Sequence, residues 1–476
     1  MMWYRQSIFI LLSTITTTVV AYSYLIDKKR KTKKKKCTNK NDVKESYDSL
    51  IGNTPLFYLH HASKHKNVPL YVKLESSNPG GTGKDRAAYY MLRHAEQNGH
   101  LPNPNDSSIT SKHADKQETM PQTNTNTTTE EWKMCQLAME KTRTGGIVVE
   151  GTSGSTGISL ATLCSSRGHA CMIVMPDDQS KEKQNLLQTL GAILYVVPTA
   201  SISNPNHYVN IARRMTQMIN DYNNNQNKIY QACFIDQFEN LANFQAHYEW
   251  TGPELLQQLS SHYNDDNNNN NNTKRKKKNN HLLFCMSSGT GGTLAGVGKY
   301  LTEQIIPSSN TTSCFSNVTL ALVDPPGSAL YNKVKYNVAY TSQQREQHFI
   351  KNQYNTIAEG IGLDRVTANF ALALPYLGKN AVTVSDQTAV DIAHYLYQYY
   401  GLFVGSSSAM NVAALLQLSS SSKKNLVGVT MICDTGQRHV TRFWNRDYIV
   451  NEWKLQWPLD DPTSWKVRLK PYIDLT

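Results

Sequence analysis

The chain has 476 residues, with 49 lysines and arginines against 37 aspartates and glutamates, and its formal net charge is +12. Residues 28–40 and 274–278 hold 14 of the 49 cationic residues, so the remainder is close to neutral and offers no basic face for nucleic acid. The eight cysteines form no Cys-x-x-Cys pair and show no metal-type spacing. The composition therefore argues against a metal site and against a disulfide framework.

Residues 7–26 carry no charge and are rich in Ile, Leu, Val, Phe and Tyr. This segment is long enough to form a membrane-spanning helix. Nine basic residues follow in 28–40, and such a charge excess stays on the cytosolic side. Neither a clear cleavage site nor an arginine-rich presequence is present. We therefore expect residues 1–44 to be a transmembrane anchor and basic linker. The predicted location is the mitochondrial outer membrane, single-pass, with the rest of the chain in the cytosol; the endoplasmic reticulum membrane is the alternative.

Beyond the linker, apolar strand-like runs alternate with helical patterns, which predicts an α/β fold with a largely parallel sheet. These runs are 171–176, 193–197, 282–286, 318–323 and 426–433. About 430 residues exceed one ordinary domain, so we expect two lobes, 45–238 and 239–476. Three polar inserts rich in Asn, Ser, Thr or Lys interrupt the pattern at 102–129, 264–280 and 308–317, and we expect them to be surface loops.

Lys84 lies at a predicted strand–turn–helix junction. The run 69–75 is short and apolar like a buried strand, Asn-Pro-Gly-Gly at 78–81 turns the chain, and 85–97 has its apolar residues on one helical face. The positive end of the helix dipole disfavours an ammonium there, and a neutral lysine amine can form an imine with an aldehyde. The alternative interpretation of one lysine is a solvated surface charge.

A glycine-rich turn connects the apolar run 282–286 to a helix-like stretch that begins at Leu294. Its residues are Gly289, Thr290, Gly291, Gly292 and Thr293. Backbone N–H groups and a helix dipole bind phosphate in this geometry. The turn lacks the Gly-Lys-Ser/Thr ending of a nucleotide P-loop and the last glycine of a dinucleotide-binding fingerprint. Asp324, at the end of the next apolar run, could still bind a ribose, although it is far from Gly289 in sequence for that role. A purely structural turn is the alternative.

A third loop, 151–157, follows the strand-like run 147–150 and opens a helix. Its hydroxyl residues are Thr152, Ser153, Ser155 and Thr156. Hydroxyls and free backbone donors suit a carboxylate, whereas a helix-capping cluster is the structural alternative. After the last strand, the side chain of Asp434 or Thr435 could meet a ring nitrogen.

Taken together, these motifs resemble those of the cysteine synthase and cystathionine β-synthase family of pyridoxal-phosphate enzymes, fold type II. The matching stretches are IGNTPL (51–56), ESSNPGGTGKDR (75–86), EGTSGSTG (150–157), QFENLANFQAHYEWTGPE (237–254), SSGTGGTLAG (287–296) and EGIG (359–362). They follow the family's order along the chain. The resemblance implies a two-lobed α/β fold with pyridoxal phosphate between the lobes, and we expect a homodimer.

The resemblance also implies a role for each candidate site residue. Lys84 would carry the cofactor as a Schiff base, the loop 289–293 would hold its phosphate, and Thr435 would meet its pyridine nitrogen. The substrate carboxylate would be bound by Thr152, Ser153, Thr156 and Gln237. Ser155 would face the cofactor where the family usually has Asn, whose amide bridges cofactor and substrate. The later serine loop of the family also differs here, as Gly405-Ser-Ser-Ser-Ala-Met410.

The implied reaction is β-replacement on O-acetylserine with sulfide to give cysteine. Two alternatives stay open at this point. Within the same chemistry, the chain could eliminate the β-substituent of cysteine or serine. In another class, it could be a membrane-tethered, cofactor-binding sensor or scaffold with little activity, against which the intact Lys84 and glycine loop argue.

Overall fold

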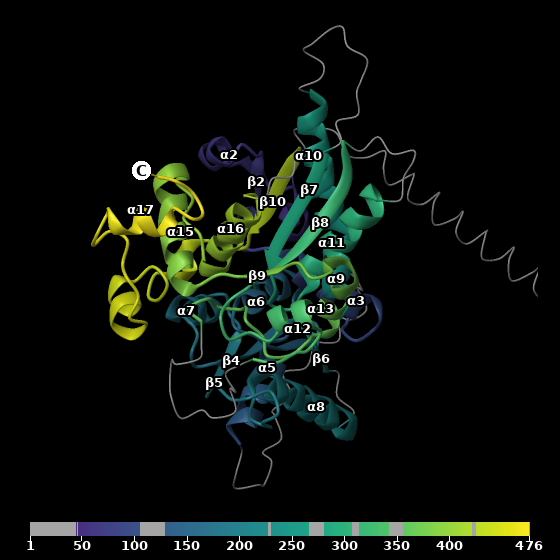
Figure 1. Cartoon of the computed structure of the whole chain (residues 1–476). Helices are drawn as coiled ribbons and strands as arrows, with labels where there is room; N and C mark the ends of the chain where they lie inside the picture. The colour runs from purple at the N-terminus through teal and green to yellow at the C-terminus, as the bar shows by residue number, and fades with distance from the viewer. Residues whose placement is uncertain are drawn as a thin grey trace, which may run out of the picture. The chain divides into compact units, whose positions relative to one another are not determined.

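The described residues form two β-sheets, drawn in Figure 1. The larger sheet has the strand order β1-β2-β10-β7-β8-β9, and the smaller has the order β5-β4-β3-β6. Every neighbouring pair of strands is parallel except β1 and β2. The strands are β1 (Leu56–Tyr58), β2 (Leu70–Leu74), β3 (Gly146–Gly151), β4 (Ala170–Pro176), β5 (Ile193–Val197), β6 (Gln231–Phe234), β7 (Asn280–Ser287), β8 (Phe315–Asp324), β9 (Ala381–Thr383) and β10 (Leu426–Ile432).

Helices connect and cover these strands, as α/β architecture requires. They are α2 (His60–Lys66), α3 (Lys84–Gln97), α5 (Glu130–Lys141), α6 (Ser155–Arg167), α7 (Lys181–Thr189), α8 (Tyr208–Gln226), α9 (Ala242–Ala246), α10 (Gly252–Asp265), α11 (Gly292–Ile305), α12 (Leu330–Tyr336), α13 (Ala368–Ala371), α14 (Leu374–Leu377), α15 (Asp386–Tyr400), α16 (Ser406–Leu418) and α17 (Ser464–Leu469). Short 3-10 helices lie at Glu75–Ser77 and Gly436–His439, and a π-helical turn joins α9 to α10 at His247–Thr251.

This computed structural model describes residues 44, 46–104, 129–226, 230–265, 280–306, 314–341, 356–420 and 425–475, and Tyr47–Thr476 form one compact unit. Among these residues, no helix is long and apolar enough to cross a membrane. The predicted anchor at 7–26 lies outside the described residues, as do most of the inserts 102–129 and 264–280.

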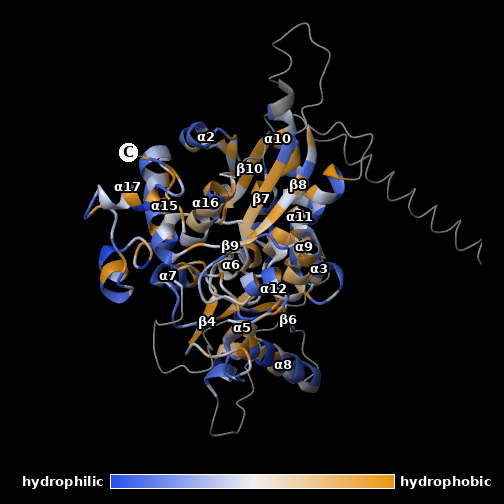
Figure 2. Cartoon of the chain, viewed as in Figure 1, coloured by the Kyte–Doolittle hydropathy of each residue, from blue (hydrophilic) through white to orange (hydrophobic). Residues whose placement is uncertain are grey.

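Alternating strand residues fill the core on both faces of the larger sheet. Leu283 and Cys285 of β7 pack in the cluster that includes α15 and α16, whereas Leu282 and Phe284 pack with α10 and α11. Figure 1 shows α15 and α16 on one side of this sheet and α11 on the other. Both faces of the parallel part of this sheet are covered in this way, so its central strands β7 and β10 are mostly hydrophobic (Figure 2).

The smaller sheet is built by the same rule. Val148 of β3 packs on the side of α3 and α6, and its neighbours Ile147 and Val149 pack on the side of α5 and α8. The helices that cover it carry hydrophilic residues on their outer sides, as α8 shows in Figure 2. The α3 and α6 helices, which begin with two of the predicted site residues, are therefore held by one shared core.

The predicted α/β fold is confirmed, and all seven predicted strands are present within a few residues of their expected limits. The short strands β1, β6 and β9 were not predicted, and the expected insert at 308–317 ends inside β8. The division into lobes 45–238 and 239–476 stays a prediction. The two sheets follow it from β3 onward, whereas β1 and β2 precede β3 in the chain and belong to the larger sheet.

Candidate active site

Lys84 is the first residue of α3, directly after the turn that follows β2. The turn packs against the end of β10, because Gly83 N donates to the carbonyl of Cys433 at 3.2 Å and Thr82 bridges Asp434. Lys84 is half-buried, and its ammonium makes no hydrogen bond or ion pair with any described residue. An amine held at a helix start without a partner can react with an aldehyde.

The glycine loop lies at the end of β7, and β10 pairs with both β2 and β7, so the loop and the Lys84 turn follow strands flanking β10. A Cβ atom on Gly289 would lie 2.3 Å from the carbonyl oxygen of Gly360, and one on Gly292 would lie 2.2 Å from Asn243 Oδ1. Gly291 has a φ of 91°, which L side chains rarely adopt. The buried hydroxyls of Ser287 and Ser288 have no hydrogen-bond partner among the described residues.

These features fit a bound phosphate. The close contacts at Gly289 and Gly292 leave no room for a side chain at either position. The loop leads directly into α11, whose N-terminal N–H groups can bind phosphate. Thr290 Oγ1 accepts from Asn243 Nδ2 at 2.8 Å, which fixes the loop from the side.

His247 fixes the other end of the loop. Its Nε2 lies 3.0 Å from Thr293 Oγ1 and its Nδ1 lies 3.0 Å from Thr251 Oγ1. Burial, with smaller contributions from nearby charges, lowers the pKa of His247 to about 3, so the imidazole is neutral at pH 7. The sequence motif 237–254 contains this histidine, but its role was not predicted.

The loop after β3 brings together three of the four predicted carboxylate ligands. Thr156 Oγ1 donates to Gln237 Oε1 at 2.5 Å, and Gln237 Nε2 donates to the Gly151 carbonyl at 3.1 Å. Thr152 is buried, and its Oγ1 accepts from Gly154 N at 3.2 Å. Ser153 Oγ lies 3.5 Å from the position that a Cβ atom on Gly360 would take, and no hydrogen bond joins it to these three residues in the described part of the chain.

Ser155 begins α6, and α6 packs against α3. The two helices are joined by Ser159, whose hydroxyl donates to Asp85 Oδ1 at 2.5 Å. Burial raises the pKa of Asp85 to about 6, against hydrogen bonds from Ser159 and Gly80 that lower it. Asp85 therefore stays largely ionised at pH 7, but it takes up a proton at a higher pH than an exposed aspartate would.

Thr435 and Asp434 follow β10, next to the Lys84 turn. His439 Nε2 lies 3.0 Å from Asp434 Oδ2. Burial opposes the charge of Asp434, but His439 and nearby cations lower its pKa to about 2. His439 engages only Oδ2 of Asp434, and Oδ1 has no hydrogen-bond partner among the described residues. The buried Asp434 carboxylate and the half-buried Thr435 hydroxyl therefore both remain candidates for a ring nitrogen.

The serines at the start of α16 were not assigned a role from the sequence. Val404 bridges Thr435, so the start of α16 lies beside Thr435. Ser408 Oγ accepts from Cys433 N at 2.8 Å, and the buried Ser406 hydroxyl has no hydrogen-bond partner among the described residues. The run of three serines at 406–408, at the start of a helical pattern, was the sequence feature that could have indicated a role for this segment.

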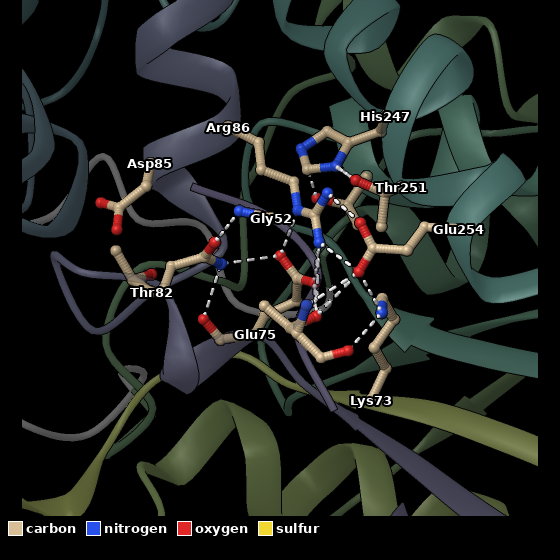
Figure 3. A network of polar contacts seen from close by, with 12 residues as sticks. Gly52, Lys73, Glu75, Thr82, Asp85, Arg86, His247, Thr251 and Glu254 are labelled. Carbon is tan, nitrogen blue, oxygen red and sulfur yellow. Dashed lines mark hydrogen bonds and ion pairs between the residues drawn. The ribbon is translucent and has the colours of Figure 1, made fainter. Parts of the chain in front are cut away.

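A buried ionic network surrounds the Lys84 turn (Figure 3). Arg86 donates to both oxygens of Glu75, with Nε–Oε2 at 2.8 Å and Nη2–Oε1 at 2.9 Å, and Lys73 Nζ lies 2.7 Å from Glu254 Oε1. Thr54 Oγ1 also donates to Glu75 Oε1 at 2.7 Å. The network joins β2, α3 and α10, so it fixes the segments on both sides of Lys84. The sequence analysis did not predict this network, although Lys73 and Glu75 are charged residues within the otherwise apolar run 69–75.

The residues present therefore fit pyridoxal phosphate: an unpartnered lysine amine, a glycine cradle for phosphate and a hydroxyl-lined loop for a carboxylate. When bound, the cofactor supplies the electron sink for chemistry at the substrate's α-carbon.

Comparison with known proteins supports this assignment. The family profile described as "Pyridoxal-phosphate dependent enzyme" matches residues 47–113 and 126–434. "Cysteine synthase 2" of Schizosaccharomyces pombe is 36% identical over 408 residues, covering 86% of this chain and 85% of that protein. The "Putative mitochondrial cysteine synthase" of Saccharomyces cerevisiae is 36% identical over 402 residues, covering 84% of each.

A solved structure of O-ureido-L-serine synthase is similar in fold, with a TM-score of 0.56 and 24% identity, and covers 84% of this chain and 95% of its own. These likenesses confirm the fold-type-II architecture expected from the motifs. The chain therefore belongs to the family of pyridoxal-phosphate dependent enzymes.

Proposed function

We propose that the chain is a cysteine synthase, which replaces the acetoxy group of O-acetylserine with sulfide and releases cysteine and acetate. The observation that carries the proposal is the Lys84 amine, which has no partner among the described residues and follows β2, while the glycine loop follows β7, the strand on the other side of β10. The cysteine synthases among its relatives, matched over most of both chains, support the choice of reaction.

In this proposal Lys84 binds the cofactor and afterwards moves the proton at the substrate's α-carbon. The glycine loop holds phosphate through the N–H groups of Gly289, Thr290, Gly291, Gly292 and Thr293. The substrate carboxylate is oriented by Thr152, Ser153, Thr156 and Gln237. Ser155 faces the cofactor, and Thr435 meets its ring nitrogen as a neutral partner, which suits loss of a β-substituent better than transamination.

The test is a steady-state assay of the purified chain from about residue 40 onward. With O-acetylserine and sulfide we expect cysteine, and with Lys84→Ala we expect none. Production of pyruvate from cysteine or serine alone, without synthesis of cysteine, would replace the synthase by the β-eliminating alternative. Binding of the cofactor with neither activity would favour the sensor or scaffold alternative.

We also propose that residues 7–26 anchor the enzyme as a single span in the mitochondrial outer membrane, facing the cytosol. The uncharged run with its basic flank supports the anchor, and one relative is named as mitochondrial. The endoplasmic reticulum membrane is the alternative. A homodimer is proposed as the working assembly, which light scattering on the purified chain would measure.

A further inference from the structure

Arg438 is a buried cation between two of the site's loops. It lies in the 3-10 helix after β10 and is 7% exposed. Its Nη2 donates to the carbonyl oxygen of Gly80, in the turn before Lys84, and its Nη1 lies 3.5 Å from Ser155 Oγ. A Cβ on Gly81 would also lie 3.3 Å from Arg438 Nη2. The guanidinium therefore lies between the Lys84 turn and the first residue of α6.

No carboxylate among the described residues forms an ion pair with Arg438. Asp85 and Asp434 feel the charge of Arg438 only from beyond ion-pair distance. Asp85 accepts from Ser159 and Gly80 N, and Asp434 uses one oxygen to pair with His439. A guanidinium has five N–H donors, of which only two meet these neutral oxygens. Burying an unpaired charge is costly, so a fold that keeps one beside its site indicates an anionic ligand there.

Position 155 gives the site of that ligand. The resemblance described above implies an amide at this position, whereas Ser155 offers one hydroxyl nearer the backbone. Arg438 lies within hydrogen-bond distance of this hydroxyl, and unlike an amide it adds a positive charge to its donors.

We propose that Arg438 is the cationic donor to an oxyanion bound over Ser155. The inference rests on the proposed function, because the oxyanion belongs to the cofactor, as its phenolate, or to the amino-acid substrate, as its carboxylate. Arg438 then contacts the cofactor or the substrate directly in the site around Lys84.

The test compares two variants that lack the charge, Arg438→Gln and Arg438→Met, with Arg438→Lys, which retains it. Two neutral variants are made so that at least one folded protein without the charge is obtained. Arg446→Gln is the matched control, because Arg446 follows in the same segment but is exposed and pairs with Asp460 at 2.8 Å. Folding is checked by circular dichroism and thermal unfolding.

Two readouts separate the sources of the oxyanion. The first is the pH at which the resting holoenzyme loses its visible absorbance. A cation beside the phenolate disfavours protonation of the Lys84–cofactor linkage, so its removal should move this midpoint up by about one pH unit. The second is the affinity for L-alanine, which lacks a leaving group; loss of a carboxylate contact should weaken it about tenfold.

A shift in the resting spectrum assigns Arg438 to the phenolate, and weaker L-alanine binding alone assigns it to the carboxylate. Arg438→Lys should lie near the wild type, and adding Ser155→Asn to Arg438→Gln should recover part of the change. Folded variants that match the wild type in both readouts would overturn the inference. Absence of the visible band from the wild type would instead refute the proposed function.

Discussion

Arg86 and Glu254 form a two-pronged ion pair across 168 residues of sequence, with Nη1–Oε2 at 2.9 Å and Nη2–Oε1 at 3.0 Å. Arg86 lies two residues after Lys84 in α3, and Glu254 lies in the first turn of α10. The position of Lys84 therefore depends on a contact from a distant part of the chain, and Figure 3 shows Glu75 and Lys73 completing the same network.

We expect Glu254→Gln to destabilise the protein strongly, because it leaves Arg86 and Lys73 without a shared counter-charge. Breaking a buried ion pair from one side costs about 3–5 kcal/mol. The measurements are the free energy of unfolding and the molar ratio of bound cofactor, and both should fall. Glu130→Gln is the control, because Glu130 pairs with Lys133 on the surface and should change stability by under about 1 kcal/mol. Equal losses in the two variants would refute the role of the network.

Acid should weaken the fold through Glu75. Burial opposes its charge, but Arg86 and Lys73 lower its pKa from 4.5 to about 2 in the folded state. A depressed carboxyl pKa stabilises the fold above the unfolded pKa, and the stabilisation is lost as the pH falls from 4.5 towards 2. Its size is on the order of 3 kcal/mol.

Denaturant unfolding of the wild type and Glu75→Gln between pH 7 and pH 2 tests this. The variant should be less stable at pH 7 and should lose less stability on acidification. Parallel pH profiles would show that Glu75 has no such role.

The glycine loop has no room for a side chain at Gly291, and the backbone there adopts a conformation that favours glycine. A Cβ there would lie 2.5 Å from the backbone of Phe370, and φ is 91°. Gly191 has a similar φ of 82° but nothing within 4 Å of its Cβ position. Gly191→Ala should therefore cost only about 1 kcal/mol of backbone strain, whereas Gly291→Ala should also release the cofactor. Equilibrium dialysis of pyridoxal phosphate measures the difference, and unchanged affinity in Gly291→Ala would contradict a phosphate site in this loop.

Much of the fold was predictable because long parallel strands are buried on both faces. The runs at β4, β7 and β10 are almost continuously apolar and buried, and β5 and the second half of β8 are also apolar in sequence, so each could be recognised locally. The strands β1, β6 and β9 have only three or four residues, too few for a pattern to emerge.

The candidate site was predictable where each part lies within one loop. The positions of Lys84 and the glycine loop follow from single strand–turn–helix segments. The contacts of Arg86 with Glu254 and of Arg438 with Ser155 join segments 168 and 283 residues apart, so no local pattern could predict them.

The proposed membrane topology predicts that protease added to intact mitochondria digests the catalytic part of the full-length chain while matrix proteins survive. The reason is the positive charge in 28–40, which should stay in the cytosol. Protection of that part until the outer membrane is ruptured would refute the orientation.

The most direct test of the account is where the cofactor attaches. The purified chain is treated with borohydride, which fixes an imine between lysine and pyridoxal phosphate, and is then digested for peptide mass analysis. We predict that the added mass lies on Lys84 and that Lys84→Ala carries none. Attachment to another lysine, or a wild-type protein that takes up no cofactor, would contradict the assignment of this site.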